Sequence, residues 1–407
     1  MNIYLSIPFA LLLLSIAILP LAAHHFWEKN SNKAFVACIL SVPVLIYLLQ
    51  HNPVEVLHTT HEYISFICLL GSLYVISGGV SLTGDLKATP FINTLMLLIG
   101  AVLANFIGTT GASMVLIRAF LKTNSERRHI KHLPVFFIFI VANCGGLLTP
   151  LGDPPLFLGF LRGVPFFWTL SLFPIWAMMN GLLLTIFFIW DSLAYRHETK
   201  KDLLDDQKHQ EPLRLKGKIN FLFLVGVMGA VFLPTPWREL GMIVMTVFSL
   251  VTTPKKLRTR NQFTWGPIIE VAVLFAGIFI TMVPALMFLK QNAAGFGITE
   301  PWQFFWWTGA LSGVLDNAPT YLTFLSMAQG LHLPAEIVGV SIKVLMAISV
   351  GAVFMGANTY IGNGPNFMIK AIADRSAIRA PSFFGYMAYA AVVLLPLYGI
   401  IHLVFLR

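Results

Sequence analysis

Residues 143–155 have the sequence Asn-Cys-Gly-Gly-Leu-Leu-Thr-Pro-Leu-Gly-Asp-Pro-Pro, and they lie inside a long apolar stretch, 133–162. Pro150, Pro154 and Pro155 cannot continue a helical ladder of hydrogen bonds. A second apolar stretch, 334–369, contains Gly-Ala-Asn-Thr-Tyr-Ile-Gly-Asn-Gly-Pro-Asn at residues 356–366. Non-helical backbone at membrane depth is tolerated only where protein or a water-filled cavity covers it. These stretches therefore predict two broken helices, each interrupted near the middle of a membrane.

The composition supports a membrane protein. Of the 407 residues, 57% are hydrophobic and 11% are charged, and the mean hydropathy is +0.77. Soluble domains usually have about 25% charged residues, so this chain has too few charges to coat a soluble surface. A soluble enzyme, a disordered scaffold and a nucleic-acid binder are therefore excluded. The three cysteines lie in apolar runs and form no ligand cluster, and we expect no disulfide, metal centre or cofactor.

The apolar pattern predicts an all-α polytopic fold. A spanning helix needs about 20 mostly apolar residues, and ten segments meet this condition or form broken crossings: 3–23, 34–50, 62–80, 133–162, 165–195, 217–234, 239–253, 264–289, 334–369 and 383–406. Two further apolar stretches, 91–121 and 302–328, carry polar clusters in their middle. We expect both to be re-entrant hairpins that enter and leave the membrane on the same side.

The loop charges predict the orientation. With both termini outside, 22 of the 27 Lys and Arg residues fall in cytoplasmic segments and four fall outside, as the positive-inside rule requires. We therefore expect both termini to be periplasmic. No Lys or Arg precedes the first apolar run, so residues 1–23 are expected to be a retained helix and not a cleaved signal peptide. The hydrophilic segment 196–216 is expected to be a cytoplasmic linker.

The two halves of the chain resemble each other. Five identities stand 210 positions apart: Gly146 and Gly356, Thr149 and Thr359, Gly152 and Gly362, Pro155 and Pro365, Phe157 and Phe367. Because the first half starts outside and the second half inside, this pattern predicts an inverted repeat of residues 1–195 and 217–407, with five helices and one hairpin in each half. Transporters with such repeats bind substrate and coupling ions near the midplane, where the interrupted segments meet.

Two acidic residues are the strongest candidates for function, Asp153 in the first broken helix and Asp316 in the second hairpin. A lone ionised carboxylate at the membrane centre costs at least about 2.5–3.5 kcal/mol, and a bound cation, a proton or a polar shell relieves that cost. We predict that both bind transported sodium. The expected polar shell is Asn105, Thr109, Thr110, Asn143, Thr149, Asn317, Thr320, Asn358, Thr359 and Asn363.

Alternatives stay open at these positions. Each Asp could be a helix-capping carboxylate, and each hairpin tip could be a packing turn whose Asn and Thr satisfy the backbone. Glu270 lies about six residues into its predicted helix, where it is either functional or snorkels to the interface.

At these motifs the chain resembles the ion transporter superfamily. The resemblance lies in the segments LANFIGTTGASMVLIR (103–118), GGLLTPLGDPPLFLGFLRGVPFFW (145–168), SGVLDNAPTYLTF (312–324) and FMGANTYIGNGPNFM (354–368). Within the superfamily they are most similar to NhaD-type sodium/proton antiporters and to the citrate-transporter group placed with them. The resemblance implies a bacterial inner-membrane carrier of the elevator type, a homodimer, with two hairpin tips and two broken helices around the site.

The resemblance also bears on the substrate. Superfamily members that carry di- and tricarboxylates have Ser-Asn-Thr signatures at both hairpins. This chain instead has Asn105 with Thr109 and Thr110 in the first hairpin and Asp316-Asn317 with Thr320 in the second. The Asp-Asn pair is similar to that of NhaD and ArsB types, which favours cation or proton coupling.

The sequence therefore predicts a secondary transporter that exchanges cytoplasmic sodium or lithium for external protons, with Asp153 and Asp316 as carriers. The alternative is sodium- or proton-coupled transport of citrate or another organic anion, whose carboxylates helix N-termini could hold. An arsenite-type efflux carrier is less favoured. An enzyme is not expected, because no nucleophile, base or metal cluster is evident.

Overall fold

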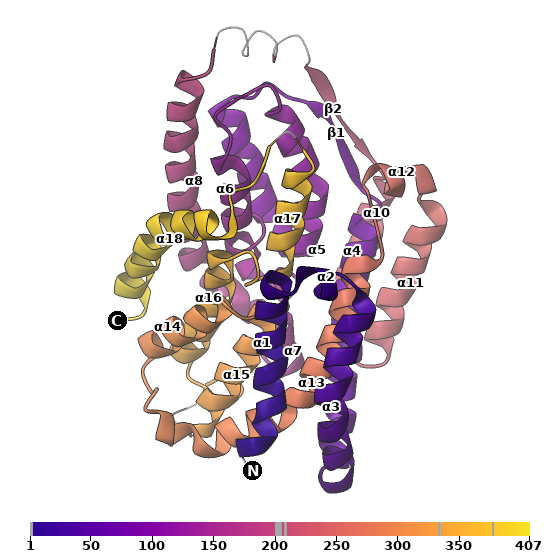
Figure 1. The fold of residues 1–407 in the computed structure, drawn as a ribbon, viewed down its shortest axis with the longest axis vertical. Helices are drawn as coiled ribbons and strands as arrows, with labels where there is room; N and C mark the ends of the chain where they lie inside the picture. The colour runs from indigo at the N-terminus through magenta and orange to yellow at the C-terminus, as the bar shows by residue number, and fades with distance from the viewer. Residues whose placement is uncertain (1–2, 200–205, 207–209, 333, 335, 377) are drawn as a thin grey trace.

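The computed structural model describes residues 3–199, 206, 210–332, 334, 336–376 and 378–407. The described chain is mostly helical (Figure 1). Seven of its helical segments are long and apolar enough to cross a membrane: Ile3–Ala22, Asn30–His51, Pro53–Ser77, Pro90–Thr123, Phe166–Arg196, Gly266–Phe296 and Phe383–Phe405. The other predicted crossings are built from shorter helices, as expected where Gly, Pro and Asn interrupt the hydrogen-bond ladder.

One group of helices surrounds α4. Its elements are η1 (Ile3–Ser6), α1 (Ile7–Ala22), α2 (His24–Trp27), α3 (Asn30–His51), α4 (Pro53–Ser77), α10 (Ile219–Ala230), α11 (Trp237–Thr252), α12 (Lys255–Arg260), α13 (Gly266–Asn292) and η4 (Ala293–Phe296). Helix α13 packs against α3 and α4, while α10 and α11 pack against the other side of α4. The two sequence halves therefore contribute neighbouring helices to this group.

Glu270 of α13 lies within this group. Its carboxylate forms an ion pair of 2.7 Å with the ammonium group of Lys33 in α3. The Lys33 side chain is 6% exposed. The pair joins α3 to α13 and offsets the cost of burying the lysine. The structure therefore gives Glu270 a charged partner on a neighbouring helix.

Helix α5 (Pro90–Thr123) is two helices joined at Gly108, whose φ is +75°. The side chains of Asn93 and Asn124 donate to each other's amide oxygens, each at 2.8 Å. The two ends of α5 therefore lie together, and the chain reverses at Gly108, where only glycine adopts this φ without strain. The Thr109 amide donates to the Gly152 carbonyl at 2.8 Å and ties the reversal to residues 143–155.

The remaining elements carry the interrupted segments. They are α6 (His132–Ile140), η2 (Cys144–Leu148), α7 (Pro154–Leu161), η3 (Phe166–Leu172), α8 (Phe173–Arg196), α14 (Pro301–Ser312), α15 (Asn317–Gly330), α16 (Ile342–Met355), η5 (Gly356–Asn358), α17 (Gly364–Asp374) and α18 (Phe383–Phe405). Helix α15 packs against α7 and α17 packs against α5, so elements of the two halves interlock. Figure 1 shows α5, α6 and α17 side by side, with α14, α15 and α16 below them.

A two-stranded sheet departs from the all-α expectation. Strand β1 (Ser81–Asp85) pairs antiparallel with β2 (Glu211–Lys216), with Leu82 opposite Leu215. The second strand lies in the segment 196–216, expected to be a cytoplasmic linker, part of which (200–205 and 207–209) is outside the described residues. This strand has six mostly exposed residues, three of them charged, and so carries little periodic signal. The strand forms because β1, 130 residues earlier, offers a ladder of backbone partners.

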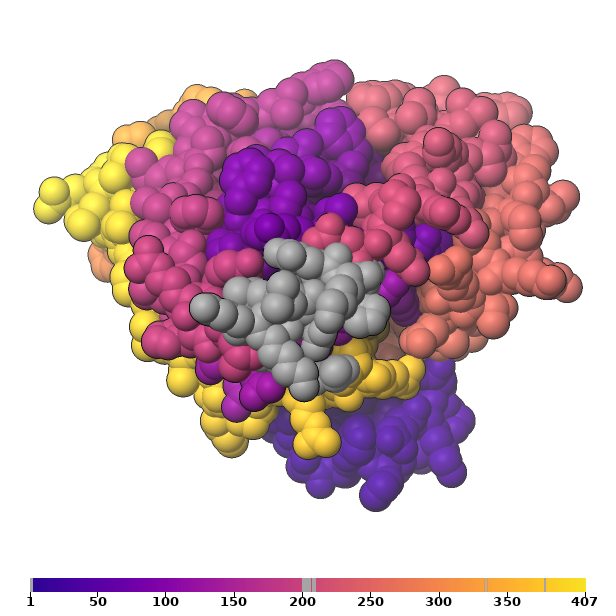
Figure 2. All heavy atoms as spheres, turned by 90° about the horizontal axis from the view of Figure 1, so that it is seen from above, coloured from indigo at the N-terminus to yellow at the C-terminus, as the bar shows by residue number. Residues whose placement is uncertain are grey.

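The molecule has three distinct flanks when it is viewed from the end that carries the sheet. In Figure 2 the first helices (indigo), α11 and α12 (salmon) and α18 (yellow) lie at different edges. The segments with polar interruptions lie between these flanks, where surrounding helices bury them. This placement satisfies the requirement that broken backbone be covered by protein.

Asp85 provides a test of the packing around the sheet. Burial and the neighbouring Glu126 raise the pKa of Asp85 from 3.8 to about 6. The folded protein therefore holds this proton more tightly than the unfolded chain. The stability that this gives is complete below pH 3.8 and is lost as the pH rises from 3.8 to about 6. We expect Asp85→Asn to raise the melting temperature at pH 8 and to have a smaller effect at pH 4.5, as measured by intrinsic tryptophan fluorescence.

The exposed Glu336 provides the control for this measurement. Glu336→Gln should change the melting temperature equally little at both pH values. A stabilisation by Asp85→Asn that is the same at pH 4.5 and pH 8 would contradict the proposed burial of a charge.

Candidate functional site

Each interrupted segment is a close crossing of the backbone over itself. A Cβ atom on Gly152 would lie 2.1 Å from the Gly146 carbonyl oxygen, and one on Gly362 would lie 2.6 Å from the Gly356 carbonyl oxygen. No side chain fits at either crossing. The glycine pairs thus bring each chain segment back across the bundle and point the following residues, Asp153 and Asn363, inward.

The conformations on either side of the two crossings match. Thr149 and Thr359 both end a 3-10 helix in extended backbone, with φ of −142° and −138°. Asp153 and Asn363 precede α7 and α17 with φ of −144° and −151°. Residues 210 positions apart thus take the same backbone geometry at these points.

Asp153 lies at the centre of a ring of hydrogen bonds. Its Oδ1 accepts from the Thr109 hydroxyl and the Asn363 amide, both at 3.0 Å, and its Oδ2 accepts from the Asn317 amide at 2.7 Å. The residue is 1% exposed. Three donors from three other segments therefore converge on one buried carboxylate, and such charge-assisted hydrogen bonds stabilise its ionised form.

Helix N-termini surround the same carboxylate. Asp153 and Asn363 immediately precede α7 and α17, Asn317 begins α15, and Thr109 begins the second part of α5. The N-terminus of a helix has unpaired N–H groups and a partial positive charge. Four such ends near one point make this region favourable for negative charge, although no Lys or Arg side chain donates to Asp153 among the described residues.

The two acidic candidates have different local roles. The Asp153 side chain makes no capping bond to its own helix, α7, so the helix-capping alternative is wrong for this residue. The Asp316 side chain does cap α15, because its Oδ1 accepts from the Ala318 amide at 3.0 Å. Asp316 is half-buried, and its side chain is outside the hydrogen-bond ring of Asp153.

Two further asparagines support the ring from behind. The Asn363 amide also donates to Asn143 Oδ1 at 3.2 Å, and the Asn143 amide donates to Asn366 Oδ1 at 2.8 Å. Asn366 is fully buried and donates to the carbonyls of Gly356 and Thr359. Asn366 is not among the site residues predicted from the sequence. Asn366 lies three residues after Asn363 at the start of α17, and therefore on the same helix face. This spacing is the sequence signal that points to Asn366 as a further site residue.

The other predicted residues lie in separate polar contacts. Asn105 accepts from the Leu148 amide at 2.8 Å, and the Thr149 hydroxyl donates to the Asn105 carbonyl at 2.5 Å. The Thr359 hydroxyl donates to the Gly313 carbonyl, and the Thr320 hydroxyl donates to the Asp316 carbonyl. Asn358 Oδ1 accepts a hydrogen bond from the Tyr398 hydroxyl. The half-buried Thr110 has no side-chain hydrogen bond within the described chain.

One acceptor next to the ring is unused. Asn317 is 1% exposed, and its Oδ1 has no hydrogen-bond partner in the described part of the chain. A buried amide oxygen without a partner loses about 1–3 kcal/mol. Together with the Asp153 carboxylate it offers oxygen atoms of the type that bind hard cations. No group of three His, Cys, Asp or Glu side chains capable of holding a resident metal ion is found among the described residues.

The profile of a family described as "Putative citrate transport" matches residues 1–406. The chain belongs to this family. The family is part of the ion transporter superfamily, so the resemblance noted in the sequence is confirmed. No curated protein matches the chain.

Membership of the citrate transport family gives the broad function. The protein is a multi-pass membrane protein and a secondary transporter of a small solute. It is not an enzyme, as the sequence predicted. For a transporter, a buried polar ring between broken helices is a candidate binding site.

The glycine crossing of this transporter can be tested directly. Gly152→Ala places a methyl group against the Gly146 carbonyl oxygen, and overpacking of this kind costs about 1–3 kcal/mol or more. We expect the variant to melt about 1–4 °C below the wild type, as measured by thermal-shift assay and size-exclusion profile in detergent.

Gly181→Ala in α8 is the matched control, because its added Cβ meets nothing within 4 Å. Gly181→Ala should keep the wild-type melting temperature or raise it slightly. Equal stability of both variants would show that the crossing is looser than described.

Proposed function

We propose that the chain is a carrier of a citrate-class organic anion coupled to sodium or protons, with its binding site at the Asp153 ring. Family membership supports the substrate class. The observation that carries the site is the convergence of four helix N-termini on one buried carboxylate. The partial positive charge at such N-termini favours a carboxylate group without need of an arginine, although Pro154 and Pro155 at the start of α7 have no N–H to donate.

The charge of Asp153 explains why transport would be coupled. An anionic substrate that approaches an ionised carboxylate in a low-dielectric site is repelled strongly. A sodium ion or a proton on Asp153 removes that repulsion. The Asp153 carboxylate and Asn317 Oδ1 provide oxygen ligands for sodium. Binding of the cation would thus precede and permit binding of the anion.

We also propose that the chain is an inverted repeat that works by an elevator-type movement in a homodimer. The matched backbone at residues 149 and 359, and at 153 and 363, supports the repeat. The ring links both halves, because Asp153 of the first half accepts from Asn317 and Asn363 of the second. Elements joined in this way would move as one unit relative to the helices around α4.

Sodium/proton antiport is the second candidate. It is favoured by the absence of a cationic side chain from the hydrogen-bond shell of Asp153 within the described residues. In this case Asp153 and the neighbouring Asp316 would bind sodium and protons in competition, because both neutralise the same charges. The polar shell would then complete the sodium site, and no anion would be carried.

A flux assay in proteoliposomes separates the two functions. We expect labelled citrate to accumulate inside when an inward sodium or proton gradient is imposed, and to stop accumulating when that gradient is dissipated. Labelled succinate and arsenite run in parallel to define the anion. If no anion enters, while added sodium moves protons as detected by a pH dye inside the vesicles, the antiport function replaces the proposal.

Asp153→Asn tests the role of the carboxylate in coupling. The substitution keeps the size of the side chain but removes the charge. Hydrogen bonds to charged groups contribute about 1.5–3 kcal/mol, and about 1.4 kcal/mol corresponds to a tenfold change in an equilibrium constant. We therefore expect gradient-driven transport to fall about tenfold or more and the residual rate to be insensitive to the coupling ion.

Asp374→Asn is the control, because Asp374 pairs with Lys370 near the end of α17 and is partly exposed. This variant should transport at the wild-type rate. A wild-type rate and an unchanged ion dependence in Asp153→Asn would remove Asp153 from the mechanism under either function.

A further inference from the structure

A short segment after α5, residues 127–132, is held against α8 by buried charges. The Arg127 guanidinium and the His132 ring contact the Asp191 carboxylate at 2.7 and 2.9 Å. The Glu198 carboxylate accepts the backbone N–H groups of the two residues after Arg127, at 3.0 and 2.8 Å. The side chains of Asp191 and Glu198 are fully buried, so the two acids of this region are enclosed behind the segment and paired.

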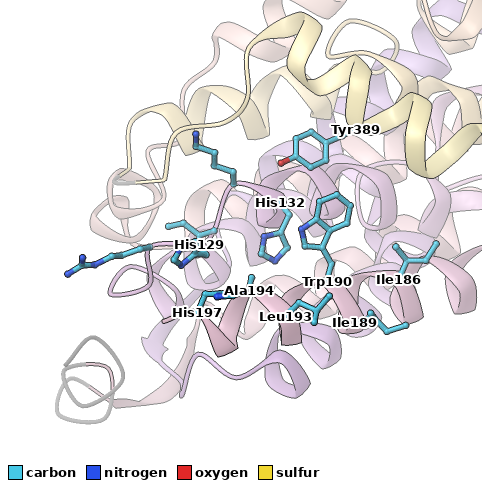
Figure 3. Close-up of a pocket in the computed structure, with 12 residues that line it drawn as sticks. His129, His132, Ile186, Ile189, Trp190, Leu193, Ala194, His197 and Tyr389 are labelled. Carbon is cyan, nitrogen blue, oxygen red and sulfur yellow. The ribbon is translucent and has the colours of Figure 1, made fainter. Parts of the chain in front are cut away.

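A pocket of about 810 Å³ lies in front of this segment, between α8 and Tyr389 of α18 (Figure 3). Arg128, His129, Lys131 and His197 line one part of it. None of the described residues that line the pocket is an Asp or a Glu. The His129 ring lies 3.5 Å from the buried Glu198 carboxylate, so the positive charge that favours an anion comes from Arg128 and Lys131.

The rest of the pocket is apolar and follows α8. Ile186, Ile189 and Leu193 line it, and the side chains of Ile189 and Leu193 are more than half exposed. Figure 3 shows His129 and His197 at one end and Ile186 and Ile189 at the other. Ile186 and His197 are separated by about 16 Å along the helix, at 1.5 Å per residue. The pocket is thus an elongated amphipathic groove that runs from a basic end to an apolar end.

The middle of the groove carries aromatic side chains. Trp190 stacks on His132 with an interplanar angle of 15°, and its ring lies 5.5 Å from that of Tyr389. Trp and Tyr are enriched where the headgroup region of a membrane meets its hydrocarbon core. Their position between the basic and apolar parts matches this boundary. The distribution of loop charges predicts that this end of α8 is cytoplasmic.

We propose that this groove binds an anionic phospholipid. Its headgroup phosphate lies at the Arg128, Lys131 and His197 end, and an acyl chain extends along Ile189 and Leu193. Phosphate chemistry alone would also fit inorganic phosphate or a soluble phosphoester. The apolar length of the groove favours the lipid, because a free phosphate ion would leave that length unused. Basic pockets between membrane helices on the cytoplasmic side bind lipid headgroups by this combination of charge and apolar contact.

Native mass spectrometry of the full-length, delipidated protein tests the proposal. The protein is titrated with phosphatidylglycerol or with phosphatidylcholine of the same acyl chains, and the bound lipid is counted. We expect phosphatidylglycerol to be retained at least about fivefold more than phosphatidylcholine. The double variant Arg128→Ala/Lys131→Ala should lose this preference. Lys255→Ala/Lys256→Ala, which removes two exposed basic residues from α12, should keep it.

Two further arms decide between lipid and free phosphate. Ile189→Ser alters the apolar part alone and should lower retention of phosphatidylglycerol, while millimolar inorganic phosphate should not displace the lipid. Equal retention of the two lipids, or equal loss in both double variants, would overturn the proposal. Displacement by inorganic phosphate together with full retention in Ile189→Ser would assign the groove to a soluble anion. Melting temperatures confirm that each variant is folded.

Discussion

The enclosure of the Asp153 carboxylate within a membrane bundle is the constraint on which the rest of the structure depends. A charge in this position costs several kcal/mol unless donors surround it. Thr109, Asn317 and Asn363 supply those donors, and each stands where a helix begins. Regular helices bond their own backbone groups and offer none at mid-bundle. The breaks in the helices are therefore the condition for having a polar site at this depth.

The breaks in turn require the glycines and asparagines around them. Gly146 and Gly152 allow the chain to cross itself without a side chain between. Asn143 and Asn366 donate to carbonyls that a broken helix leaves unpaired. Removal of one member would leave the others buried without partners, which costs more than the bond itself contributes. This dependence explains why polar residues and glycines alternate so densely in otherwise apolar segments.

Much of this arrangement could be predicted because membrane folding imposes strong local rules. Helix ranges followed from hydropathy, and Asp153 with Thr109, Asn317 and Asn363 was selected because polar residues at membrane depth are rare. Three features are not evident from the sequence pattern alone. Asn366 has only its spacing from Asn363 as a signal, and its contact with Asn143 is seen in the structure. The pairing of β1 with β2 joins residues 126 to 135 positions apart. Asp316 caps α15 and does not enter the ring. This depends on the rotamer of its side chain, which the sequence does not specify.

The ring has two electrostatic tendencies that act in opposite directions. Its helix N-termini attract negative charge, and the Asp153 carboxylate already satisfies part of that attraction. Once a cation neutralises Asp153, the N-termini are again available to an anion. A site of this kind favours cation and anion together over either one alone, because each removes the charge that the other leaves uncompensated. The same ring without an anion to accommodate would simply exchange one cation for another. Coupled uptake and antiport thus differ in whether an anion binds beside the neutralised Asp153, and not in the ring itself.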